Sequence, residues 1–100
     1  MTRYVLADAA KSDLLGIWRY LDEHAGSEIA QSVVGDLRKA MRALARNPGI
    51  GHRREELTHA PVRFWRVGSY FVIYEPDTKP LAIVRVVHVS RDLALMLEPQ

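Results

Sequence analysis

The 100-residue sequence contains no cysteine, so it has neither a disulfide framework nor a thiolate site. No apolar run approaches the roughly 18 residues needed to span a bilayer, and the start, MTRYVLADAAKSD, lacks the apolar stretch of a signal peptide. We therefore expect a protein of the cytoplasm that makes no membrane contact. The four histidines show no recognised metal-ligand spacing, and no glycine-rich phosphate loop is present. We expect neither a metal site nor a cofactor.

Length and composition indicate one small globular domain. A chain of 100 residues has room for a single modest core, and its apolar fraction of 48% argues against disorder. We therefore treat residues 1–100 as one domain. The formal net charge is only +2, but 11 of the 14 cationic residues are arginine. The planar guanidinium of arginine suits carboxylates, phosphates and protein interfaces.

Two stretches of helical periodicity follow a short β-prone segment over residues 3–6. Asp8 lies where the first helix should begin, as its N-cap or first-turn residue, and Ser27 is the N-cap candidate of the second. The Asn-Pro-Gly of 47–49 ends the second helix. Apolar residues recur every three or four positions, in the first helix at Ala10, Leu14, Ile17 and Leu21 and in the second at Ala30, Val33, Leu37, Ala40 and Leu44. The pattern predicts a helical hairpin.

The second half of the chain changes to a periodicity of two, which is typical of strands. We therefore predict an α+β fold of order β-α-α-β-β-β, in which the helical hairpin packs on a mainly antiparallel sheet. After a polar loop over 49–60, the expected elements are strands over 62–67, 70–75 and 81–89, turns over 68–69 and 76–80, and a short C-terminal helix over 90–97.

The last predicted strand carries the polar side chains with the clearest chemical potential. Alternation places Arg85 on the face of Ile83 and His88 on the face of Val84, unless a bulge interrupts the strand. Opposite faces are a poor arrangement for a joint active site. We interpret His88 as a partly buried, structural imidazole hydrogen-bonded to nearby backbone or to Asp92. A catalytic group delivered by a strand end is the alternative.

Several blocks together resemble the ParE branch of the RelE/ParE toxin superfamily. The most specific features are an arginine-bearing strand, Gly-Ser-Tyr at a hairpin, a strand that ends in Tyr-Glu-Pro, and Val-Arg-Val-Val-His with Arg-Asp close behind. The blocks cover most of the chain in the right order: AAKSDLLGIWRYL (9–21), ALARNPGIGHRREEL (43–57), VRFWRVGSYFVIYEP (62–76) and IVRVVHVSRDL (83–93).

This resemblance implies the toxin half of a type II toxin–antitoxin pair. ParE-like toxins poison DNA gyrase by binding it, without catalysis, and a small ParD-like antitoxin wraps and neutralises them. The antitoxin also binds operator DNA, so the toxin would meet DNA only indirectly. Apolar side chains of the hairpin and sheet arginines suit contact with helical and acidic parts of an antitoxin. The residues that we expect at this contact are Leu15, Trp18, Val34, Arg63, Arg66 and Arg85.

Two alternatives stay open. RelE-like relatives cut mRNA in the ribosome, which requires a proton acceptor, a proton donor and cations that stabilise the charged transition state. If the chain is such an endoribonuclease, its candidate groups are Arg66, Tyr70, Arg85 and His88. A nucleic-acid-binding module is the other alternative, because clustered cations with stacking aromatics would serve it. Its candidates are Arg63, Trp65, Arg66 and Tyr70.

Overall fold

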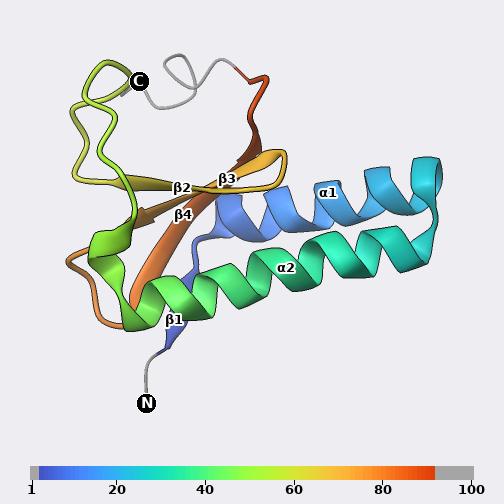
Figure 1. Cartoon of the computed structure of the whole chain (residues 1–100), viewed down its shortest axis with the longest axis horizontal. Helices are drawn as coiled ribbons and strands as arrows, with labels where there is room; N and C mark the ends of the chain where they lie inside the picture. Colours follow the sequence, from blue (N-terminus) through green and yellow to red (C-terminus); the bar gives the residue numbers. More distant parts are fainter. Residues whose placement is uncertain (1–2, 92–100) are drawn as a thin grey trace.

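The computed structural model describes residues 3–91 and confirms the predicted α+β order (Figure 1). No helix within that range is long and apolar enough to cross a membrane. The predicted C-terminal helix over 90–97 lies outside the described residues beyond Arg91. The elements are β1 (Tyr4–Leu6), α1 (Asp8–Ala25), α2 (Ser27–Arg46), the 3₁₀ turn η1 (Pro48–Ile50), β2 (Arg63–Val67), β3 (Tyr70–Glu75) and β4 (Leu81–His88).

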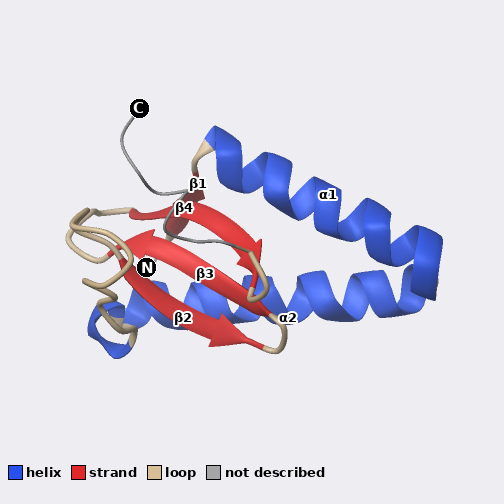
Figure 2. Cartoon of the chain, turned by 90° about the horizontal axis from the view of Figure 1, so that it is seen from above, coloured by secondary structure: helices blue, strands red, loops and turns tan. Residues whose placement is uncertain are grey.

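The two helices form a hairpin joined by a single residue, Gly26. Its φ of +95° lies in the region that favours glycine, and its N–H donates to Asp22 O, which closes α1. Gly26 is also the N-cap of α2, so the expectation that Ser27 holds this position is wrong by one residue. Asp8 lies in the first turn of α1, as predicted. Both helices extend past one end of the sheet (Figures 1 and 2).

The sheet has the strand order β1-β4-β3-β2. β1 pairs in parallel with the first three residues of β4, Leu81 to Ile83, and the other neighbours are antiparallel. Beyond Ile83, β4 has no strand beside it on the β1 side in the described part of the chain. A strand edge without a neighbour exposes backbone N–H and C=O groups, which other parts of the chain or a partner must satisfy.

Apolar side chains bury both faces of the sheet. The hairpin covers one face, where a helix-side core includes Leu14, Leu37, Met41, Val72 and Ile83. Tyr74 is fully buried in this core. The opposite face holds a smaller far-side cluster, which consists of Val62, Phe64, Ile73 and Val87 with Leu57, Phe71 and Val84 packed against it. Burial on both faces explains why the last strand is apolar along nearly its whole length.

A bulge in β4 changes the predicted alternation. The register passes from Ile73 opposite Arg85 to Tyr74 opposite Ile83, so Val84 has no partner in β3. Ile83 therefore belongs to the helix-side core, whereas Arg85 lies opposite a residue of the far-side cluster. Grouping Arg85 with Ile83, and His88 with Val84, was wrong because the extra residue reverses the faces on its two sides.

Candidate partner-binding groove

A groove of about 980 Å³ is the main concave feature described for residues 3–91. It lies between the hairpin of helices and the end of the sheet where β4 has no neighbour, and Figure 2 shows these elements side by side. Its walls come from four parts of the fold: Ser12, Asp13, Gly16, Ile17, Tyr20 and Leu21 of α1; Val33 and Asp36 of α2; Val67, Gly68, Ser69 and Tyr70 around the β2–β3 turn; and Val86, Val87, His88, Ser90 and Arg91 at the end of β4.

The groove combines an apolar floor with a polar rim. Ile17, Leu21 and Val33 are half-buried, and Tyr20 is 59% exposed. Tyr20 stacks on His24 with ring centroids 4.3 Å apart, so the aromatic side chain is supported by a turn of its own helix. An open apolar depression rimmed by polar groups suits a protein segment better than a small polar substrate.

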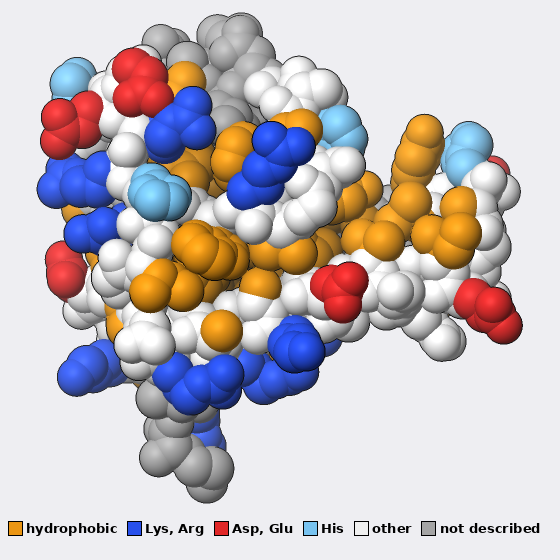
Figure 3. All heavy atoms as spheres, viewed as in Figure 1, with side chains coloured by type: hydrophobic (Ala, Val, Ile, Leu, Met, Phe, Trp, Pro, Cys, Tyr) orange, Lys and Arg blue, Asp and Glu red, His pale blue; other side chains and the backbone are white. Residues whose placement is uncertain are grey.

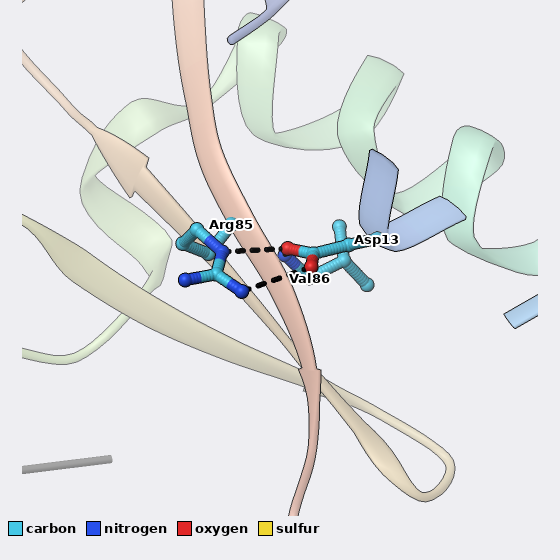
Figure 4. Close-up of polar contacts among 3 residues, drawn as sticks. All are labelled: Asp13, Arg85 and Val86. Atoms are coloured by element: carbon cyan, nitrogen blue, oxygen red, sulfur yellow. Dashed lines mark hydrogen bonds and ion pairs between the residues drawn. The ribbon is translucent and has the colours of Figure 1, made fainter. Parts of the chain in front are cut away.

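Asp13 fixes α1 against β4 at one edge of this groove (Figure 4). Arg85 donates from Nε to Asp13 Oδ2 at 2.8 Å and from Nη2 to Oδ1 at 2.9 Å. Val86 N–H also donates to Oδ2, at 2.9 Å. One carboxylate thus satisfies an edge amide of β4 and pairs the guanidinium, and this pairing raises the pKa of Arg85. We call this arrangement the Asp13 anchor.

Tyr70 and His88 face each other across β3 and β4 at the groove. Their rings meet edge to face with centroids 5.4 Å apart. Burial, with a smaller effect of Tyr20, raises the pKa of Tyr70, so the phenol is protonated at neutral pH. The N–H of Ser90 donates to His88 Nδ1 at 3.1 Å, and Ser90 Oγ lies 2.8 Å from the same nitrogen. The predicted hydrogen bond of His88 to nearby backbone is confirmed.

The predicted burial of His88 is wrong, because its side chain is exposed at the end of β4. Its other predicted partner, Asp92, lies outside the described residues. His88 is exposed because β4 ends at this residue. The helices beside it form a wall of the open groove and do not cover the imidazole.

The four nuclease candidates do not converge on one site. Tyr70 and His88 line the groove, whereas Arg66 and Arg85 lie opposite Phe71 and Ile73 on the other face of the sheet. Arg66 donates to its own turn at Gly68 O, and Arg85 is paired with Asp13. Within residues 3–91, no group of three or more histidine, aspartate or glutamate side chains is placed to hold a metal ion.

None of the six residues expected at the antitoxin contact lines the groove. At 3.6 residues per turn, Trp18 points about 160° away from Tyr20 around α1, and Val34 points about 160° away from Asp36 around α2. Leu15 is 51% exposed, and Trp18 and Val34 are half-buried. These three residues, the outer apolar set, therefore lie on the other side of the hairpin from the groove.

The three expected arginines are also separated. Arg63 is half-buried on the helix-facing side of the sheet and donates to Gly51 O at 2.8 Å, so it holds the loop after η1. Arg66 is exposed on the opposite face. Alternation along β2 puts Arg63 on the face of Trp65, which packs on the helix-side core, and Arg66 on the face of Phe64, which belongs to the far-side cluster.

Sequence reasoning missed Asp13, Gly16 and Tyr20, which form the α1 wall of the groove. One signal indicated an acidic partner for Arg85. A lone arginine inside an apolar strand needs such a partner, because charged groups are rarely buried unpaired. The sequence alone does not say which acid supplies that partner, since Asp13 and Arg85 are 72 positions apart.

The comparisons with known proteins agree with this geometry. Residues 4–93 match the family model described as the ParE toxin of the type II toxin–antitoxin system parDE. The chain is 34% identical over 90 residues to Toxin ParE1 of Caulobacter vibrioides, with 90% of this chain and 92% of that protein covered. It is 29% identical over 93 residues to Toxin ParE1 of Mycobacterium tuberculosis, with 92% and 94% covered.

A solved structure titled as the chromosomal ParDE toxin–antitoxin system of P. aeruginosa has a similar fold. The TM-score is 0.75 at 21% sequence identity, and the match covers 90% of this chain and 98% of that one. This likeness supports the fold, and the family model supports the assignment over nearly the whole chain. The chain therefore belongs to the ParE toxin family of type II toxin–antitoxin systems.

Proposed function

We propose that this toxin inhibits DNA gyrase by binding it, and that a ParD-like antitoxin holds the toxin inactive. The observation that carries the proposal is the family match over residues 4–93, because ParE-like toxins act in this way. Gyrase inhibition would block replication and growth without any bond being made or broken by the toxin.

A supercoiling assay tests this proposal directly. Purified toxin added to gyrase and relaxed plasmid, with no ribosome present, should stop supercoiling, and prior incubation with the antitoxin should restore it. Full supercoiling in the presence of a large molar excess of toxin would contradict the proposal.

The separation of the nuclease candidates favours binding over RNA cleavage. A proton acceptor and a stabilising cation must both reach the same phosphate. Here His88 and Arg85 project from opposite faces of β4, and the Arg85 guanidinium is already paired with Asp13. We therefore expect His88→Ala to keep its toxicity in cells, and primer extension on mRNA from those cells to show no codon-linked cuts. Clear cuts would favour the endoribonuclease instead.

For the antitoxin, we propose contacts on both sides of the hairpin. The outer apolar set (Leu15, Trp18, Val34) and the groove are separate surfaces of one narrow element, so a partner that wraps the toxin can reach both. Acidic antitoxin side chains would meet the sheet arginines Arg63, Arg66 and Arg85, as charge complementarity suggests. Of these, Arg66 is the exposed one.

Glycine substitutions allow the groove to be blocked without disturbing the core. A Cβ added at Gly16 or at Gly35 meets no atom within 4 Å, and both positions are helical and exposed. Gly16 lines the groove and Gly35 does not. Gly16→Gln should therefore weaken binding to the proposed ParD-like antitoxin at least tenfold, roughly 1.4 kcal/mol, as should Leu15→Gln on the outer side.

Gly35→Gln is the matched control and should bind the antitoxin like the unmodified toxin. Calorimetric titration measures all three variants. Normal binding by both Gly16→Gln and Leu15→Gln would exclude the hairpin as the contact.

A further inference from the structure

A row of cations follows the solvent-facing side of α2, on a surface that the groove does not include. Arg38, Lys39, Arg42 and Arg46 are all exposed, and at 3.6 residues per turn they fall within about 100° of arc. Figure 3 shows lysine and arginine side chains along the lower edge of the molecule, where Figure 1 places the second half of α2. We call these four residues the α2 basic stripe.

No carboxylate within residues 3–91 forms an ion pair with the α2 basic stripe. The ion pairs among residues 3–91 are Arg53–Glu55, Arg54–Glu56 and Arg85–Asp13, none of which includes a residue of the stripe. Among the described residues, the stripe makes one side-chain hydrogen bond, in which Arg38 Nη1 donates to Tyr4 Oη at 3.4 Å. Like charges four residues apart destabilise a helix by a few tenths of a kcal/mol. The helix dipole offsets this for Arg46 in the last turn, but its effect fades over the turns before.

The stripe also carries no apolar side chain. Ile29 is the exposed large apolar residue of α2, and it lies about 80° outside the arc. Protein interfaces bury apolar and aromatic groups at their centre, and single-stranded nucleic acids are held by stacking on aromatic rings. A cationic surface that lacks both suits the phosphate backbone of a duplex, which needs only charge.

The length of the stripe matches such a backbone. Eight residues separate Arg38 from Arg46, which is about 12 Å along the helix axis. One strand of DNA carries a charge every 3.4 Å of its axis, so the phosphates beside a row of this length are numerous enough for each of the four side chains to reach one. We propose that the α2 basic stripe binds the phosphate backbone of double-stranded DNA without reading its sequence. This direct contact goes beyond the proposed inhibition of gyrase and does not depend on it.

Salt dependence of binding to a short labelled DNA duplex of arbitrary sequence tests the inference. With four phosphate contacts, a plot of log K against log salt concentration should have a slope of about −3.6. The double variant Lys39→Gln/Arg42→Gln should remove two of the proposed phosphate contacts. Neither side chain takes part in an ion pair within the described residues, so the substitutions break none of these pairs. The slope should fall by about two units and binding should weaken at least tenfold near 0.1 M salt.

The matched control is Arg19→Gln/Lys79→Gln, which removes one arginine and one lysine, changes the net charge equally, and lies at exposed positions outside the stripe and the groove. Its slope should stay within about one unit of the unmodified toxin. An equal or larger loss in this control would overturn the inference, because net charge and not the stripe would then carry binding. So would the absence of salt-dependent binding, tighter binding to an RNA duplex of the same length, or tighter binding to phosphatidylglycerol vesicles.

Discussion

The chain is held together at two places by polar clusters of different kinds. At the end of α2, the buried phenol of Tyr74 accepts a hydrogen bond from Gly51 N–H at 2.9 Å and donates to Pro48 O at 2.7 Å. We call this the Tyr74 anchor. At α1, the Asp13 anchor uses a carboxylate and a guanidinium whose side chains are 16% and 26% exposed. The first cluster is centred on a neutral, fully buried phenol, and the second is charged and partly exposed.

The difference reflects what each cluster faces. A buried charge loses several kcal/mol of hydration, so an uncharged hydroxyl is the less costly group inside the helix-side core. The Asp13 anchor lies on the rim of the groove, where water still solvates part of the pair. The neutral anchor should therefore be sensitive to shape, and the charged anchor to the loss of one partner.

Gly51→Ala should have the largest effect on stability, because it attacks the shape of the Tyr74 anchor. A Cβ at this position would clash with Tyr74 Cε1 at 2.8 Å and Cζ at 2.9 Å, and also with Oη. The φ of Gly51 is −73°, which alanine adopts readily, so the clash alone is responsible. We expect a loss of about 3 kcal/mol in the free energy of unfolding, measured by urea denaturation.

Gly49→Ala provides the comparison, since a Cβ there meets nothing within 4 Å. It should change the free energy of unfolding by less than about 0.5 kcal/mol. A Gly51→Ala protein as stable as Gly49→Ala would mean that the phenol moves freely and does not anchor the loop.

Asp13→Ala should have the next largest effect, about 2 kcal/mol. It leaves the Arg85 guanidinium without its partner and Val86 N–H without an acceptor. Partial exposure of both side chains keeps the loss below that of a fully buried pair. Asp13→Asn keeps an oxygen for Val86 N–H and should lose about half as much.

Thermal and urea unfolding of both Asp13 variants separate the ion pair from the amide contact. Asp22→Ala, an exposed aspartate on the same helix, should change the free energy of unfolding by less than about 0.5 kcal/mol. Equal losses in Asp13→Asn and Asp13→Ala would assign the whole effect to charge and none to the strand edge.

These anchors also mark where sequence reasoning succeeded and where it ended. Periodicity identified both helices and all of the later strands, because amphipathic spacing is a local property. The bulge at Val84 left no signal, since the apolar run around it fits a regular strand equally well. The position of β1 beside β4 was also hidden, because it depends on a contact between the two ends of the chain.

The candidate site was harder to predict than the fold. Leu15 and Trp18 stood out as surplus apolar residues of α1, and they do lie at the edge of the core or outside it. The groove, however, arises where the helices extend past the sheet, and helix and strand lengths relative to each other decide that. Asp13 is an ordinary polar residue in the local pattern and acquires its role only through Arg85.

Alkaline pH should produce the smallest of the expected effects, and it distinguishes the two anchors. Burial raises the pKa of Tyr74 above the ordinary value for tyrosine, against a smaller lowering by Gly51 N–H. A group with a raised pKa in the folded state contributes stability that is complete below about pH 10 and is lost as pH rises further. The guanidinium of the Asp13 anchor stays charged over this range, because the hydrogen bond to Asp13 raises the pKa of Arg85. In thermal unfolding, the difference in stability between the unmodified toxin and Tyr74→Phe should therefore shrink above about pH 10. The difference between the unmodified toxin and Asp13→Asn should stay constant. If the stability difference between the unmodified toxin and Asp13→Asn also shrinks in this range, the two anchors are coupled.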